Sequence, residues 1–191
     1  LDSNGRNSTG TITVNAGGNV DVRDKVRSRS KGHGPTATGG AIDIHADGTV
    51  TSVTKATIDV RGKRNSTAAG QVTVGGDAGV TLNGQVDVRG NPGGTASINS
   101  AAGDVSLNNK LRGEGSPGGG GSFVIDAAGN LTLNTPVKVS GGAPGGGGTV
   151  ALTAGTAAAI VIRNVNASGL GAPAGTVSAT GGSFEGRTIT A

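Results

Sequence analysis

Apolar and polar residues alternate along most of the chain, and the alternation recurs in one form: a glycine, one further residue, then two apolar residues separated by one other. Clear examples are Gly40-Ala-Ile-Asp-Ile44 and Gly70-Gln-Val-Thr-Val74. A period of two predicts β-strands, because successive strand side chains point to opposite faces. The intervals between the last apolar residues of successive segments are 30, 30, 24, 27, 27 and 27 residues, for Val14, Ile44, Val74, Ile98, Ile125, Leu152 and Ala179. The pattern therefore indicates an internal repeat of about 27 residues.

Each repeat predicts two further short strands. The second strands carry Val20/Val22, Val50 through Val53, Val80/Leu82, Val105/Leu107, Leu131/Leu133 and Ile160/Ile162. The third strands carry Val26/Ser28, Ile58/Val60, Val86/Val88, Leu111, Val137/Val139 and Val165/Ala167. Three strands per repeat predict a triangular coil, and stacked coils are expected to form three parallel sheets around an apolar interior.

The expected fold is thus all-β: a parallel β-helix, or solenoid, of about seven coils with three strands per coil. Right-handed winding is expected because crossovers between parallel strands almost always have that hand. We expect one domain over residues 1–191, with a polar N-terminal segment at 1–9 and repeat coils at 10–191. A continuous interior column is predicted from Ile44, Val74, Val88, Ile125, Leu133 and Ile162.

Composition supports a narrow repetitive interior rather than a conventional core. The chain has 39 glycines and no Cys, Met, Trp or Tyr, and its only aromatic residues are Phe123 and Phe184. Abundant β-branched residues in alternation disfavour disorder, and glycine lacks the three-residue period of collagen. The lack of cysteine excludes disulfides, cysteine-ligated zinc and thiol catalysis. No stretch approaches the roughly 18 apolar residues of a membrane helix, and no signal-peptide pattern opens the chain, so membrane insertion is not expected.

The repeat resembles a known family. The string Gly-Gly-x-Ile-x-Ile-x-Ala-x-Gly-x-Val, continued by a third strand and a glycine, is clear in Gly39 through Gly62 and in Gly70 through Gly90. It resembles the repeats of filamentous-haemagglutinin-like adhesins, which leave the cell by two-partner secretion, and it is similar to autotransporter passenger domains. The resemblance spans Gly10 to about Ala179 and implies an extended, secreted β-helix at the cell surface. The chain departs from that family in its shortness, in glycine runs such as Gly118 to Gly121, and in lacking the amino-terminal secretion module.

Positive charge is concentrated at one end of the chain. The formal charge is +4, and residues 1–64 hold ten Lys/Arg against six Asp/Glu, whereas the remainder holds six of each. The cluster Lys25, Arg27, Arg29 and Lys31 could attract nucleic acid or an anionic polysaccharide. No stacking aromatics accompany it, so a solvated face is favoured over an anion site and no specific nucleic-acid partner is expected.

An acidic pair is the one candidate for catalysis. Asp59 and Asp87 occupy the same predicted outward position of the third strand in adjacent coils, where they could form a carboxylate dyad. Arg61 and Arg89 follow two residues on, and the flanking positions of the predicted column Arg27, Asp59, Asp87, Lys110 are basic. A compensated charge ladder is therefore favoured. We expect no catalytic, cofactor-binding or metal-binding residues and no enzymatic activity.

Other candidate sites have weaker support. Neither His33 nor His45 has a second histidine or a cysteine at ligand spacing, and Gly75-Gly-Asp-Ala-Gly79 lacks the calcium-binding nonapeptide pattern. Glycosylation sequons stand at Asn7, Asn65, Asn130 and Asn166. Outward threonines typical of ice-binding solenoids occur at Thr11, Thr13, Thr73, Thr81 and Thr132, but equivalent positions hold Asp43, Ser97, Ala151 and Ser178.

The favoured function is a non-enzymatic extracellular structural or adhesive solenoid. Head-to-tail self-association into a filament is expected, because Leu1 to Thr9 is polar and Arg187 to Ala191 still alternates like a strand, so neither end resembles a cap. A surface polysaccharide or a cell-surface ligand is the other expected partner. The alternatives are a β-helix carbohydrate-active enzyme or carbohydrate-binding protein and, less favoured, an ice-binding protein.

Overall fold

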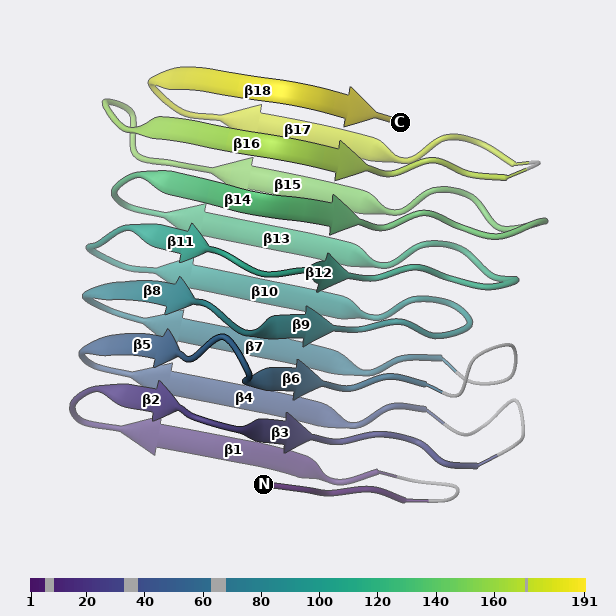
Figure 1. The fold of residues 1–191 in the computed structure, drawn as a ribbon, viewed down its shortest axis with the longest axis horizontal. Helices are drawn as coiled ribbons and strands as arrows, with labels where there is room; N and C mark the ends of the chain where they lie inside the picture. The colour runs from purple at the N-terminus through teal and green to yellow at the C-terminus, as the bar shows by residue number, and fades with distance from the viewer. Residues whose placement is uncertain (6–8, 33–37, 63–67, 171) are drawn as a thin grey trace.

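The computed structural model describes residues 1–5, 9–32, 38–62, 68–170 and 172–191 of the chain. Over these residues the protein is a parallel β-solenoid of about six turns, in which seven successive coils each contribute a first strand, with a spacing of about 27 residues (Figure 1). No helix long and apolar enough to cross a membrane occurs in the part of the chain that the structure describes. The predictions made for His33, Asn7 and Asn65 lie outside the described residues.

The first strands of the coils form one parallel sheet. Its seven strands follow the order β1 (Thr11–Ala16), β4 (Ala41–Ala46), β7 (Gln71–Gly76), β10 (Thr95–Ser100), β13 (Ser122–Ala127), β15 (Thr149–Thr153) and β17 (Thr176–Thr180). Val14 pairs with Ile44, Ile44 with Val74, and Val74 with Ile98. The predicted register of the repeat is therefore confirmed.

The second and third strands lie together in the other sheet. The first four coils keep them separate, as β2 (Val20–Val22) and β3 (Lys25–Arg27), β5 (Thr49–Ser52) and β6 (Thr57–Asp59), β8 (Gly79–Leu82) and β9 (Gln85–Asp87), and β11 (Val105–Leu107) and β12 (Leu111–Arg112). In the last three coils they merge into single long strands, β14 (Leu131–Lys138), β16 (Ala159–Asn166) and β18 (Ser183–Thr190). The described strands thus form two sheets instead of the predicted three.

The merging has a local cause. Leu82 and Val86 are separated by Asn-Gly-Gln, and Leu107 and Leu111 by Asn-Asn-Lys, which are residues that favour turns. Leu133 and Val137 are separated by Asn-Thr-Pro, whose β-branched and proline residues favour extended backbone. The two strands therefore run on as one, with a register irregularity between Leu133 and Pro136.

The solenoid is right-handed. In Figure 1 the chain climbs from the N-terminus to the C-terminus, while the strands in front run to the right and the fainter first strands behind run to the left. The described parts of the long loops after the third strand lie along one edge, at the right of the view. The turns between first and second strands lie along the opposite edge.

The interior contains the predicted apolar column. All six predicted residues are buried, with exposed fractions of at most 2% (Ile44, Val74, Val88, Ile125, Leu133, Ile162). Phe123 is also fully buried, and its rung neighbour is the small Ala96. A Cβ on Gly113 would lie 3.1 Å from Cε2 of Phe123, so this glycine also makes room for the ring. One aromatic ring fits because two positions around it are small.

The polar N-terminal segment joins the sheet. Ser3 N–H donates to the Arg27 carbonyl at 2.8 Å, and Arg27 N–H donates to the Leu1 carbonyl at 2.9 Å. Lys31 N–H donates to the Gly5 carbonyl at 2.8 Å. Residues 1–5 therefore pair with the third-strand side of the first coil, although the sequence predicted only a polar segment outside the repeat coils there.

Candidate functional site

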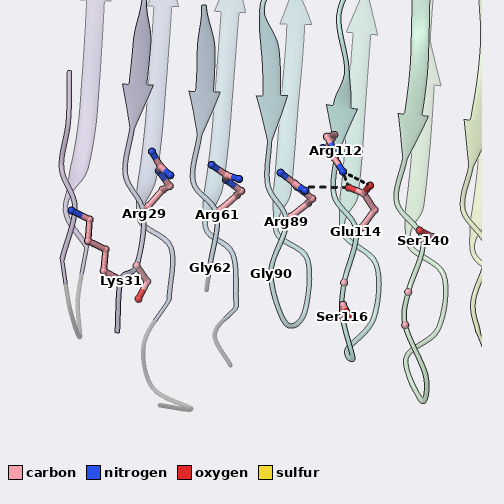
Figure 2. Close-up of a pocket in the computed structure, with 14 residues that line it drawn as sticks. Arg29, Lys31, Arg61, Gly62, Arg89, Gly90, Arg112, Glu114, Ser116 and Ser140 are labelled. Atoms are coloured by element: carbon pink, nitrogen blue, oxygen red, sulfur yellow. Dashed lines mark hydrogen bonds and ion pairs between the residues drawn. The ribbon is translucent and has the colours of Figure 1, made fainter. Parts of the chain in front are cut away.

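A row of charged side chains follows the third strands at the edge where the long loops begin. The register aligns Arg27 with Asp59, Asp59 with Asp87, and Asp87 with Arg112. Two residues further on, each coil contributes another charged residue. Figure 2 shows Arg29, Arg61 and Arg89 side by side on successive coils, followed in the same row by Glu114 and then Ser140. We use the name arginine row for Arg29, Arg61, Arg89, Glu114 and Ser140 together with Asp59, Asp87 and Arg112.

Asp59 lies beneath two guanidinium groups. Arg61 donates from Nε to Oδ1 at 3.0 Å and from Nη2 to Oδ2 at 2.9 Å, and its backbone N–H donates to Oδ1 at 3.1 Å. Arg29, from the preceding coil, brings Nε to 3.3 Å from Oδ2. The Asp59 side chain has no exposed surface. Its carboxylate is therefore enclosed by charge-assisted contacts from two coils.

The arrangement recurs one coil later around Asp87. Arg89 donates from Nε to Oδ1 at 2.8 Å and from Nη2 to Oδ2 at 2.6 Å, while Nε of Arg61 lies 3.5 Å from Oδ2. These hydrogen bonds to Asp87 raise the pKa of Arg89 above the ordinary arginine value. Arg89 therefore carries its positive charge throughout the physiological pH range.

The next coil reverses the polarity of the motif. Arg112 stands where Asp59 and Asp87 stand, and Glu114 takes the place of the arginines. Arg112 Nη2 lies 3.2 Å from Oε1 of Glu114, and Nε of Arg89 lies 4.0 Å from Oε2. The sequence argument missed Glu114, although Arg-Gly-Glu at 112–114 has the same spacing as Asp-Val-Arg at 59–61 and 87–89.

Two details of the predicted ladder are wrong. Asp59 and Asp87 were expected on an open outward face, but they are 0% and 1% exposed, because arginine side chains fold over them. Lys110 was expected in the aspartate column, but Leu111 pairs with Val86, so Arg112 stands opposite Asp87. Lys110 lies before the strand and is exposed.

A groove runs along the arginine row. Its volume is about 670 Å³, and it spans coils from Arg29 to Gly142. Among the described residues, five cationic side chains line it (Arg29, Lys31, Arg61, Arg89, Arg112), together with Glu114 and several serines and glycines. The four arginine side chains keep 26–34% of their surface exposed. The carboxylates at the groove are Glu114 and, beneath the arginines, Asp59 and Asp87. The five positive charges therefore exceed the three negative charges by two.

The predicted basic cluster separates into two kinds of residue. Lys25 and Lys31 are exposed, whereas Arg27 and Arg29 are half-buried. Nε of Arg27 and Nε of Arg29 are buried and make no hydrogen bond of normal geometry among the described residues, although Nε of Arg29 keeps its ion-pair contact with Asp59. Only part of the cluster is therefore a solvated face, and Arg29 belongs to the groove wall.

The other sequence candidates fall on different surfaces. His45 lies on the outer face of β4, with Asp47 and Asp77 beside it. Asn130 accepts a hydrogen bond from Ala159 N–H at 3.0 Å, and Asn166 accepts one from Ser168 Oγ at 2.7 Å. The register confirms that the outward threonines form no continuous column, because Thr13 stacks on Asp43 before Thr73 and Ser97 follow.

The fold and the groove define the protein as a β-solenoid compatible with β-helix repeat proteins. Comparison of the chain with protein-family models, with curated proteins and with solved structures found no match. The likeness to filamentous-haemagglutinin-like adhesins thus stays a resemblance of the repeat pattern alone.

Proposed function

We propose that this chain is a non-enzymatic, extracellular structural and adhesive solenoid whose arginine-lined groove binds an acidic polysaccharide. The observation that carries the proposal is the row of Arg29, Arg61 and Arg89 along an open groove (Figure 2). A stack of parallel strands repeats its side chains about every 4.8 Å. A linear polyuronate presents a regularly repeated carboxylate along an extended chain, so several of its charges can face successive coils.

Guanidinium groups suit this task. Arginine has five N–H donors in a planar fork that matches a carboxylate, and it remains charged at every relevant pH. In the described hydrogen bonds to Asp59, Arg61 uses Nε and Nη2. The buried aspartates hold the forks in fixed orientations, which lowers the entropy lost when a ligand binds.

The same geometry argues against a carbohydrate-active enzyme. A general acid or a nucleophile must bring a carboxyl oxygen to the substrate. Asp59 and Asp87 are covered by arginines, with both oxygens of each carboxylate engaged. This supports the structural interpretation of the acidic pair.

Titration calorimetry with polygalacturonate tests the proposal. We expect binding that weakens as NaCl rises, because screening reduces attraction between exposed charges. Fully methyl-esterified polygalacturonate has the same backbone without the charge and should not bind. The double variant Lys31→Gln/Arg89→Gln should lose about tenfold or more in affinity, whereas Arg163→Gln/Arg187→Gln, outside the groove, should bind normally. If the esterified polymer bound equally well, or if both double variants lost the same affinity, the groove would not bind the polymer through its charged carboxylates.

Head-to-tail self-association is a second candidate function, favoured by the outermost described coil. Strand β18 is exposed along its whole length, and Phe184 and Ile189 are 52% and 46% exposed. An exposed strand such as β18 can pair in parallel with a strand of a second copy through backbone hydrogen bonds. Sedimentation velocity should show larger species as concentration rises, and Phe184→Ser/Ile189→Ser should reduce them. A monomer at every concentration would exclude this candidate.

A further inference from the structure

The edge opposite the arginine row carries a cluster of possible metal ligands. Asp47 follows β4 and Asp77 follows β7, and the two occupy equivalent turns of the second and third coils. His45 Nε2 lies 3.6 Å from Oδ1 of Asp47. One ligand atom from each of His45, Asp47 and Asp77 lies within 4.8 Å of the others. In Figure 1 these turns are at the left edge, between β4 and β5 and between β7 and β8.

The local sequence leaves open space around the imidazole. The outward column at this point reads Asn15, His45, Gly75, Asn99. A Cβ on Gly75 would lie 3.3 Å from Nδ1 of His45 and 3.1 Å from Oδ1 of Asn99. Gly75 lies within strand β7 and its φ is not in the left-handed region, so the backbone does not require glycine there. Glycine instead gives the ring room and lets the Asn99 amide face the same space.

The negative charges of Asp47 and Asp77 are a second reason to expect a bound cation at this cluster. Stacked like charges on adjacent strands repel, and neither aspartate has a Lys or Arg within ion-pair distance among the described residues. A divalent ion between Asp47 and Asp77 would turn this repulsion into a link between two coils. Both carboxylates are exposed, so solvent water can complete the coordination.

We propose that His45, Asp47 and Asp77 form a surface site for a borderline divalent transition-metal ion, for which Zn²⁺ is the probe, with Asn99 placed to orient the imidazole. One imidazole and two carboxylates suit such an ion better than Mg²⁺ or Ca²⁺, which prefer oxygen ligands alone. Ligating histidines usually bond a partner through their other ring nitrogen, and Nδ1 of His45 faces the space beside Asn99. The site lies on the edge away from the groove and does not depend on the proposed polysaccharide binding.

The sequence contained a signal for this cluster. His45 has no second histidine or cysteine at ligand spacing, so the sequence pattern predicted no metal site. The missing ligand is 30 residues away in sequence and one coil away in space, since Asp77 repeats Asp47. In a solenoid, ligand spacing must be sought at the repeat length as well as within one strand.

Titration calorimetry with ZnCl₂ and with MgCl₂ on the full chain tests the site. We expect one Zn²⁺ per chain and no comparable Mg²⁺ binding. His45→Ala and Asp77→Asn should each weaken Zn²⁺ binding about tenfold or more. Asp43→Asn, which removes one carboxylate from the same strand, and His33→Ala, which removes the other histidine, should leave it unchanged. Nuclear magnetic resonance should show the His45 ring signals shifting with Zn²⁺.

A thermal melt supplies an independent readout. Zn²⁺ bound to the folded protein should raise the unfolding midpoint of the wild type by mass action, and should not raise that of His45→Ala. Absence of Zn²⁺ binding, or equal binding by His45→Ala, would overturn the proposal. Equal loss in His33→Ala would do the same.

Discussion

The first four coils and the last three share one interior but present different exteriors. Away from the outermost coils, the inward positions of both regions are buried and apolar, as with Val74 in the early coils and Leu133 in the late ones, whereas strand β18 is exposed. Along the third strands the outer residues differ. The second and third coils carry Asp-x-Arg, whereas the equivalent places hold Lys138 and Ser140 in the coil of β14 and Asn166 and Ser168 in the coil of β16.

One local hydrogen bond is common to both regions. Arg61 N–H donates to Oδ1 of Asp59 at 3.1 Å, and Ser168 N–H donates to Oδ1 of Asn166 at 3.0 Å. A side-chain oxygen therefore satisfies the backbone two residues on in each case, with or without a charge. Arg27, Arg112 and Lys138 occupy the same position in other coils, so the fold tolerates a residue without an acceptor there. The aspartate coils differ in adding arginine side chains that line the groove.

The largest expected effect is on the shared interior. Val74→Asp places a charge in a fully buried position, where an uncompensated polar group costs several kcal/mol, here about 4 kcal/mol or more. We expect loss of the cooperative β-type thermal transition by circular dichroism, and Leu133→Asp should behave alike. Gln71→Asp, on the exposed start of the same strand β7, is the control and should melt near the wild type. A normal melt for Val74→Asp would refute the register.

The second largest effect is expected when the buried carboxylate of Asp59 is removed from the early coils. Asp59→Ala removes the carboxylate that the half-buried Arg29 and Arg61 share, leaving Arg61 only its longer contact with Asp87, and removing one partner of a buried ion pair costs about 3 kcal/mol. Partial exposure of both arginines places the expected loss at the lower end of that range. Chemical denaturation at neutral pH measures it. If the free energy of unfolding fell by less than the error of the measurement, these ion pairs would not contribute to stability.

The third effect is the matching change in the late coils. Asn166→Ala removes the acceptor for Ser168 N–H and Oγ without leaving a charge unpaired. The expected loss of unfolding free energy is about 1 kcal/mol, the usual contribution of a neutral hydrogen bond. If denaturation showed Asn166→Ala to be as damaging as Asp59→Ala, charge would not distinguish the two regions.

The smallest expected change in stability comes from extending the ladder. Lys138 pairs with Arg112 in register, and Ser140 follows Glu114 in the row. Lys138→Asp/Ser140→Arg should alter stability by less than about 1 kcal/mol, because partly exposed ion pairs contribute little. Calorimetry with polygalacturonate should nevertheless show tighter binding, since the row gains an arginine. Unchanged binding would place the ligand elsewhere.

The buried interior was predictable from sequence because the alternation of apolar and polar residues recurs in every coil, at a spacing of about 27 residues. Val88 and Ile162 were placed correctly on alternation alone. The merging of second and third strands was not foreseen, because it depends on whether three residues such as Asn-Thr-Pro extend or bend. The burial of Asp59 was also missed, since alternation predicts the face of a residue but not whether an arginine from the next coil covers it.

The most direct test of the account is an amide hydrogen-exchange footprint of bound polygalacturonate. The account predicts added protection at the loop-edge amides of the early coils, around Arg29, Arg61 and Arg89, and none around Ser168. Exchange in the buried strands of both regions should stay slow and equal with or without ligand. Protection centred on the late coils, or none at saturating ligand, would contradict the assignment of binding to the arginine row.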